Sequence, residues 1–210
     1  LSIQQHSLGP EHPEVANTES NLAATEFALA HYPEALSELN RAISIREKAG
    51  AGTGELANDR DLRGEVLEAM GRPGEGLTDH QRALAIRERV YGATSPFRGL
   101  SLTRMASAYL VLQQPAKGLE LAREALALEE GSTIDPTEQA LARFVLARAL
   151  DANHEDRERA LSLAKEARRQ LTEHQVEQSP YLHQMDAWLA AHERSRDRHL
   201  ASGGPPAAPR

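Results

Sequence analysis

The chain has 210 residues, of which 40% are hydrophobic and only 4% aromatic, with a formal charge of −7 and no cysteine. Without cysteine, disulfides, thiolate metal sites and thiol nucleophiles are excluded, and 24 basic against 31 acidic residues argue against a nucleic-acid partner. The sequence shows neither a run of 18 apolar residues nor a signal peptide. We therefore expect a cytoplasmic protein that does not act at a membrane.

One helical motif recurs four times along the chain: "EALSELNRAISIRE" (34–47), "EGLTDHQRALAIRE" (75–88), "KGLELAREALALEE" (117–130) and "RALSLAKEARRQLT" (159–172). Small residues occupy three columns at intervals of 41 or 42 residues. These columns are Ala23, Gly64, Ala106 and Ala147; Ala35, Gly76, Gly118 and Ala160; and Ala42, Ala83, Ala125 and Ala167. Small residues at one fixed period indicate a repeat architecture in which neighbouring helices approach closely.

Each unit is predicted to contain two helices. Its second helix is apolar at the spacing of one helical face. Proline separates the two helices in "HYP" (31–33), "RPG" (72–74) and "QQP" (113–115). Ser95 and Asp135 each precede a proline and are predicted N-caps, and Glu138 is positioned to form a capping box with Asp135.

These elements divide the chain into a lead-in segment (1–10), an array (11–175), a capping helix (176–200) and a disordered tail (201–210). The array comprises units at about 11–50, 51–92, 93–132 and 133–175. A capping helix is needed because the last repeat otherwise leaves its apolar face in water. Its predicted apolar side consists of Tyr181, Leu182, Met185, Trp188 and Leu189.

The first unit, "GPEHPEVANTESNLAATEFALAHYPEALSELNRAISIREK" (9–48), resembles the tetratricopeptide repeats, and more closely their variant of about 42 residues found in kinesin light chains. The resemblance covers roughly 8–175 and implies an all-α, right-handed α-solenoid. Two positions depart from the family pattern, because Arg63 and His80 stand where apolar residues are usual.

A second resemblance concerns the end of the chain. Residues 146–168 and 186–192 are similar to the C-terminal repeat region of bacterial serine/threonine protein kinases. The chain also begins with Leu1 instead of methionine, as a fragment of a longer protein would. The alternative function is therefore a regulatory or substrate-docking region of such a kinase. No kinase motif lies in the chain itself, and we expect this segment not to be an enzyme.

Other chemistry finds little support in the spacing of residues. The densest histidine group, His174, His183, His192 and His199, has no second ligand at the spacing that a helical zinc site needs. The segment "GAGTG" (50–54) has neither a following lysine nor a preceding strand, so a helix connector is favoured over a phosphate loop. No metal and no cofactor are expected.

In stacked helix pairs, the first helices line the concave surface. Their outward residues are predicted to form a partner-binding groove that is mildly acidic and partly apolar. It comprises Asn17, Ser20, Asn21, Ala24, Phe27, Asn58, Asp61, Glu65, Glu68, Thr103, Ser107, Leu110, Leu141, Phe144, Arg148 and Asp151. Because its acids outnumber its single arginine, we expect a protein or peptide partner, preferably a basic and apolar segment. A solvated surface without a ligand is the competing interpretation.

Overall fold

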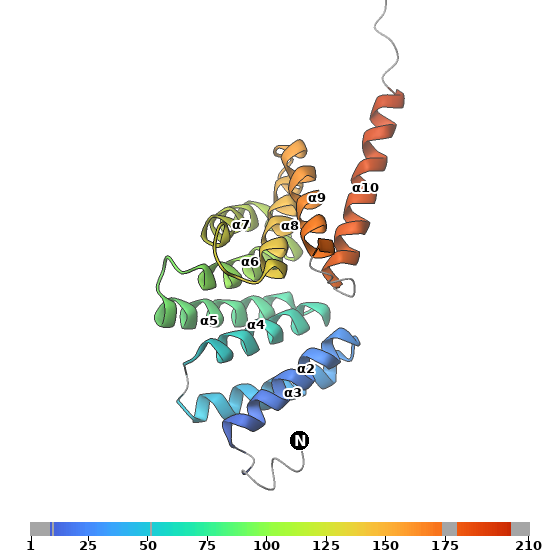
Figure 1. Ribbon diagram of the computed structural model, residues 1–210. Coiled ribbons are helices and arrows are strands. Elements are labelled where there is room, and N and C mark those ends of the chain that lie inside the picture. Colours follow the sequence, from blue (N-terminus) through green and yellow to red (C-terminus); the bar gives the residue numbers. More distant parts are fainter. Residues whose placement is uncertain (1–8, 10, 51, 174–179, 203–210) are drawn as a thin grey trace, which may run out of the picture.

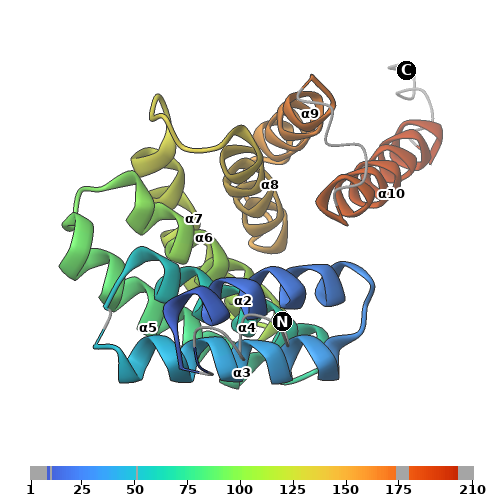
Figure 2. The ribbon, with the colours of Figure 1, turned by 60° about the horizontal axis from the view of Figure 1, so that its bottom comes forward.

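The computed structural model describes residues 9, 11–50, 52–173 and 180–202, and every regular element in those ranges is an α-helix. In chain order these are α2 (Pro13–Ala28), α3 (Tyr32–Lys48), α4 (Gly54–Ala69), α5 (Pro73–Tyr91), α6 (Pro96–Val111), α7 (Pro115–Glu129), α8 (Pro136–Ala152), α9 (Arg157–Glu173) and α10 (Pro180–Ser202). Successive antiparallel pairs stack one on the next (Figure 1), and the stack follows a curve (Figure 2). The predicted all-α solenoid of four helix pairs with a C-terminal helix is confirmed.

The helix starts follow from proline and from short polar side chains. Ser95 and Asp135 accept hydrogen bonds from the backbone N–H groups of Phe97 and Thr137, which satisfies donors that a helix start leaves free. Both predicted N-caps are confirmed. The predicted capping box is wrong, because the Glu138 carboxylate instead forms an ion pair with a side chain of α6.

Small residues allow the two helices of a unit to touch through their backbones. A Cβ atom at Gly76 would lie 2.6 Å from the carbonyl oxygen of Gly64, and one at Gly118 would lie 3.1 Å from that of Ala106. These two contacts occupy the same place in the second and third units. The close approach predicted from the small-residue columns is therefore present.

A residue with a left-handed backbone conformation follows the first helix of every unit. Ala30, Gly71, Gln113 and His154 stand 41 or 42 residues apart and have φ angles of 61°, 76°, 58° and 55°. A left-handed residue after a helix redirects the chain, and glycine is the residue that adopts it most readily. Only one of the four is glycine, so the turn geometry does not depend on the residue type.

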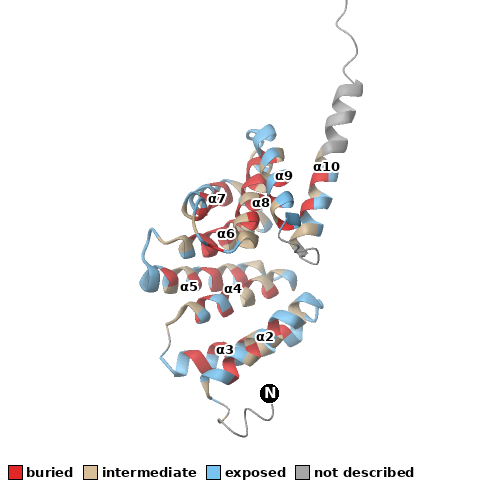
Figure 3. Cartoon of the chain, in the orientation of Figure 1, coloured by how far each residue is buried: buried red, intermediate tan, exposed pale blue. Residues whose placement is uncertain are grey.

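The buried interior differs between the two ends of the array. One continuous hydrophobic cluster joins α6, α7, α8, α9 and α10, whereas the first two units contain only two small apolar clusters. The described part of these two units also buries charged residues: Glu19, Arg46, Asp59, Arg60, Asp61, Asp79, His80 and Arg87. Figure 3 shows buried positions on the helix faces that meet a neighbour.

Helix α10 covers the last repeat as predicted. Met185 and Leu189 are buried in the large cluster, and Tyr181, Leu182 and Trp188 pack against it. The helix includes Ala201 and Ser202, so the predicted start of a disordered tail at residue 201 is two residues early. The rest of that tail, most of the lead-in segment, and residues 174–179 lie outside the described residues. Among the helices described, none is long and apolar enough to cross a membrane.

Candidate functional site: a concave pocket with a charged wall

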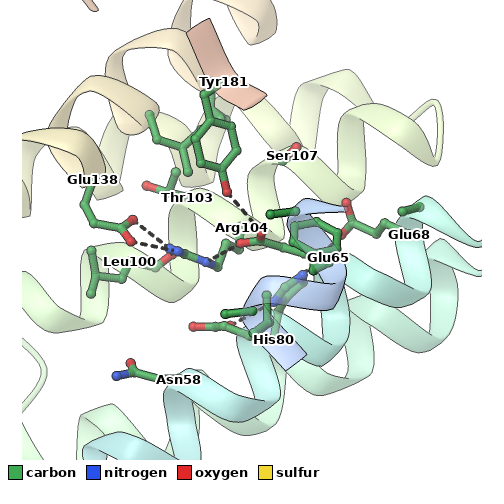
Figure 4. A pocket seen from close by; sticks show the side chains of 18 of the residues that line it. Asn58, Glu65, Glu68, His80, Leu100, Thr103, Arg104, Ser107, Glu138 and Tyr181 are labelled. Carbon is green, nitrogen blue, oxygen red and sulfur yellow. Dashed lines mark hydrogen bonds and ion pairs between the residues drawn. The ribbon is translucent and has the colours of Figure 1, made fainter. Parts of the chain in front are cut away.

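A pocket of about 930 Å³ opens on the side of the array that the first helices line. Residues of α2, α4, α6 and α8 form most of its surface, and the start of α10 contributes Tyr181 and Gln184. Its volume lies within the range of ligand-binding clefts. Figure 4 shows polar side chains from several units meeting on one wall.

Arg104 of α6 connects three units at the centre of this wall. Its Nε donates to Glu65 Oε1 at 2.8 Å, and its two terminal nitrogens donate to the Glu138 carboxylate at 3.0 and 2.9 Å. The Tyr181 hydroxyl donates to the other Glu65 oxygen at 3.0 Å (Figure 4). Burial opposes the charge on Arg104, but the two carboxylates raise its pKa well above the ordinary value. The guanidinium is therefore a fixed charge that joins α4, α6 and α8, and Tyr181 attaches α10 to the same group through Glu65.

His80 is the centre of a second charged group on the same wall. Its Nδ1 lies 2.8 Å from Asp61 Oδ1 and its Nε2 lies 3.2 Å from Glu68 Oε1. Burial lowers the pKa of His80, but the two carboxylates outweigh it and raise the pKa to about 9. The ring fits because Gly64 has no side chain, since a Cβ there would lie 2.4 Å from the imidazole. The buried histidine is thus protonated at neutral pH and neutralises part of the acidic charge.

Arg87 of α5, which also lines the pocket, completes the neutralisation. It pairs with Asp61, donates to the Ser101 hydroxyl, and donates to Asn58 Oδ1 at 2.8 Å. Burial opposes ionisation of Asp61, yet Arg87 and His80 together lower its pKa to about 2. The carboxylate is ionised and fully paired at neutral pH.

Two charged groups that line the pocket have no ion pair within the part of the chain described here. Glu55 is exposed in the first turn of α4, and the nearby Thr53 side chain is the main cause that lowers its pKa. Arg148 of α8 makes one long hydrogen bond, 3.5 Å, to Ser107, and its guanidinium carbon lies 5.9 Å from the centre of the Phe144 ring. Burial lowers the pKa of Arg148. Both groups remain able to bind a ligand.

The family model for tetratricopeptide repeats matches residues 1–48 and 56–130, which is more than half of the chain. The chain belongs to the tetratricopeptide repeat family. Its array is accordingly a non-catalytic scaffold for protein–protein interaction.

Several solved structures share the fold of this array. Podosopora anserina "putative kinesin light chain nearly identical TPR-like repeats" is 23% identical with a TM-score of 0.62, over 83% of this chain and 82% of that chain. BtubC (BKLC) from P. vanneervenii is 15% identical with a TM-score of 0.67, over 82% of this chain and 70% of that chain.

A third similar structure is a Rap protein complexed with Competence and Sporulation Factor. It is 16% identical with a TM-score of 0.72, over 90% of this chain and 51% of that chain. No curated protein matches the chain.

Ten of the sixteen residues predicted for the groove of this tetratricopeptide array line the pocket. They are Ala24, Phe27, Asn58, Asp61, Glu65, Glu68, Thr103, Ser107, Leu141 and Arg148. Asp61 and Thr103 are nevertheless buried, with 2% and 1% of their surface exposed, so a partner cannot bind them directly without displacing their neighbours.

The other six predicted residues do not line it. Asn17 accepts a hydrogen bond from Arg46 of its own unit, Ser20 donates to Asp59 of the second unit, and Asn21 lies exposed outside the pocket. The other three residues contact neighbouring side chains or backbone instead. Leu110 lies against Gly118, Phe144 packs against Trp188 at 6.1 Å between ring centres, and Asp151 binds His192 at 2.8 Å. The capping helix thus covers part of the fourth unit that was assigned to the groove.

Sequence reasoning missed the cations that face the predicted acids, namely Arg104, Arg87 and His80. It also missed Glu138, which pairs with Arg104, and Tyr181, which donates to Glu65. One signal was available, since His80 departs from the family pattern at an apolar position. Because three of the predicted acids already have cationic partners, the wall is far less acidic than the sequence indicates. Among the described residues, no group of three or more histidine or acidic side chains is arranged to hold a metal ion.

Proposed function

We propose that the concave pocket binds an extended segment of a protein partner. The proposal depends on one observation: the first helices of all four units contribute to a single pocket, and ion pairs hold its polar wall in place. A wall whose charges are already paired needs no reorganisation when a ligand enters, which reduces the cost of binding. Its apolar lining, including Phe27, Leu62 and Leu141, offers contacts for side chains of the segment.

The pocket is long enough for a short peptide. Glu55 and Glu68 both line it and lie thirteen residues apart on α4, a separation of ~20 Å at 1.5 Å per residue. An extended segment of about six residues spans that distance at ~3.4 Å per residue. The solved complex of a Rap protein with Competence and Sporulation Factor supports the proposal that such a fold receives another molecule.

The proposed preference is for a segment that is apolar and carries basic residues. Five carboxylates line the pocket against three guanidiniums and His80, so one negative charge remains when His80 is protonated. This excess is small, and each exposed charge contributes only ~1 kcal/mol or less. A basic residue near Glu55 is favoured, and one acidic residue near the unpaired Arg148 is tolerated.

A display selection with a library of ten-residue segments tests this function. Ser107→Trp fills the pocket, and Ser162→Trp is the matched control on the exposed face of α9. We expect the selected segments to bind the parent chain and the control equally and to lose at least tenfold in affinity for Ser107→Trp, ~1.4 kcal/mol or more. Equal binding to all three chains would place the partner surface elsewhere.

The resemblance to the C-terminal region of bacterial serine/threonine kinases supports a second candidate, a docking region of such a kinase. The two resembling segments lie together, since His192 of α10 binds Asp151 of α8, and Arg157 donates to the His192 carbonyl. A full-length coding sequence that contains a kinase domain, together with loss of substrate phosphorylation in the Ser107→Trp variant, would support this candidate.

A further inference from the structure

Two aromatic rings stand exposed at one end of the pocket. Tyr91, the last residue of α5, and Phe97, in the first turn of α6, are 42% and 45% exposed. Their ring centres are 4.6 Å apart, and the ring planes are tilted by 31°. Both line the pocket together with Glu55 of α4. We call Glu55, Tyr91 and Phe97 the aromatic mouth.

The backbone of α4 is shaped to hold one of these rings. A Cβ at Gly54 would lie 2.2 Å from the Tyr91 hydroxyl oxygen, so the ring lies directly against the glycine that precedes Glu55. The ring is therefore fixed beside the start of α4 while much of its surface stays in water. Exposed aromatic rings that are held in place lose little conformational freedom when they bind a partner.

The charge at the aromatic mouth is negative and unpaired. Glu55 makes no ion pair among the residues described, whereas Glu65, Glu68 and Glu138 in the same pocket all have cationic partners. Arg46, the cation that acts on Glu55 electrostatically, is already bound to Asp59. Arg89 lies against Gly52 and does not line the pocket.

We propose that the aromatic mouth is the subsite for an arginine or lysine side chain of the bound segment. The faces of aromatic rings attract cations, and a neighbouring carboxylate adds a hydrogen-bonded ion pair. Arginine fits best, because its planar guanidinium stacks on a ring while it donates to a carboxylate. The inference rests on the proposed function of the pocket, and it places a basic residue of the bound segment at the aromatic mouth.

The direct test uses N-acetyl-arginine amide as the probe and its uncharged isostere, N-acetyl-citrulline amide, as the matched ligand. Ring signals of Tyr91 and Phe97 are followed by NMR during titration of the parent chain. We expect saturable shifts with the arginine probe and an affinity for citrulline lower by about fivefold, ~1 kcal/mol. Equal binding of the two probes, or no shift of either ring, would overturn the inference.

Two variants test whether the charge of Glu55 is what binds the probe. Glu55→Gln should weaken the arginine probe by the same factor as the change to citrulline, while Glu120→Gln on the exposed face of α7 should leave it unchanged. An unchanged affinity in Glu55→Gln would also overturn the inference.

The outcome is distinguishable from failure of the proposed function, because the probe is small enough to bind without the rest of the pocket. Arginine binding at the mouth without any segment selected by display would leave this inference intact and remove the proposed function. Conversely, selected segments that keep their affinity when every arginine is replaced by citrulline and every lysine by norleucine would retain the proposed function and remove the inference.

Discussion

The two halves of the array are held together by different interactions on the same backbone. The first two units bury ion pairs between their helices, whereas the last two units and α10 share one hydrophobic cluster. One column of the repeat shows the change: Arg46, Arg87, Glu129 and Leu171 occupy equivalent places 41 or 42 residues apart, and all four are buried. The period of the backbone therefore sets how the units stack, and a buried position of the repeat can hold either a charged or an apolar side chain.

The third member of that column shows what happens when the cation is lost. Arg46 and Arg87 each pair with an aspartate, but Glu129 has a single hydrogen bond, from the Thr103 hydroxyl at 3.2 Å. Its second carboxylate oxygen is buried without a partner. Burial and the neighbouring Glu138 raise the pKa of Glu129 to about 8, so the carboxyl group is protonated at neutral pH.

Asp61→Ala should have the largest effect on stability in the charged half. The substitution leaves Arg87 and His80 buried without their shared carboxylate, and breaking such a network costs about 3–5 kcal/mol of unfolding free energy. Urea unfolding at pH 7 measures it. The matched control, Glu75→Ala, removes a carboxylate whose pair with Arg72 is exposed, and it should leave the unfolding midpoint unchanged. Similar unfolding midpoints for the two variants would show that the buried ion pairs of Asp61 do not stabilise the first two units.

Leu146→Ala tests the apolar half. Leu146 is 1% exposed within the large cluster, and truncation of a buried leucine costs about 2–5 kcal/mol. We expect this loss to be the same from pH 4 to pH 9, since no titrating group is removed. The loss caused by Asp61→Ala should instead shrink as the pH falls towards 2, the pKa of Asp61. A Leu146→Ala loss that varies with pH would contradict the division into two halves.

Glu129→Gln should have a smaller effect that grows with pH. The pKa of Glu129 is raised on folding, so its contribution to stability is fully present below pH ~4.5 and is lost as the pH rises through about 8. A glutamine keeps a polar group beside Thr103 without a charge. The variant should match the parent at pH 4, gain on it as the pH rises towards 8, and show no further gain above that pH. Thermal unfolding across this range measures the gain, and a constant difference would show that Glu129 is not protonated.

The stack and its helix starts could be predicted from the sequence because each depends on local residues. Gly76 and Gly118 mark backbone contacts within a unit, and Ser95 and Asp135 mark helix starts. Such features depend on spacing and on residue size. They can be recognised in a single sequence because they recur from unit to unit.

The wall of the pocket could not be predicted in the same way. Arg104 bridges Glu65 and Glu138, which lie 39 and 34 residues away, and the bridge depends on how three units are rotated against one another. His80 was recognisable as an unusual residue, but its two carboxylate partners were not. Phe144 is 1% exposed and packs against Trp188 of the capping helix, a contact that the repeat pattern does not indicate because α10 is not part of a repeat.

Hydrogen exchange of the chain, with and without a segment obtained by display selection, tests whether the concave pocket is the binding surface. Binding should slow amide exchange in α4, α6 and α8, whose residues line the pocket, and leave α7 and α9 unchanged. Slowed exchange confined to α7 and α9 would contradict the account and move the partner surface to the opposite side of the array.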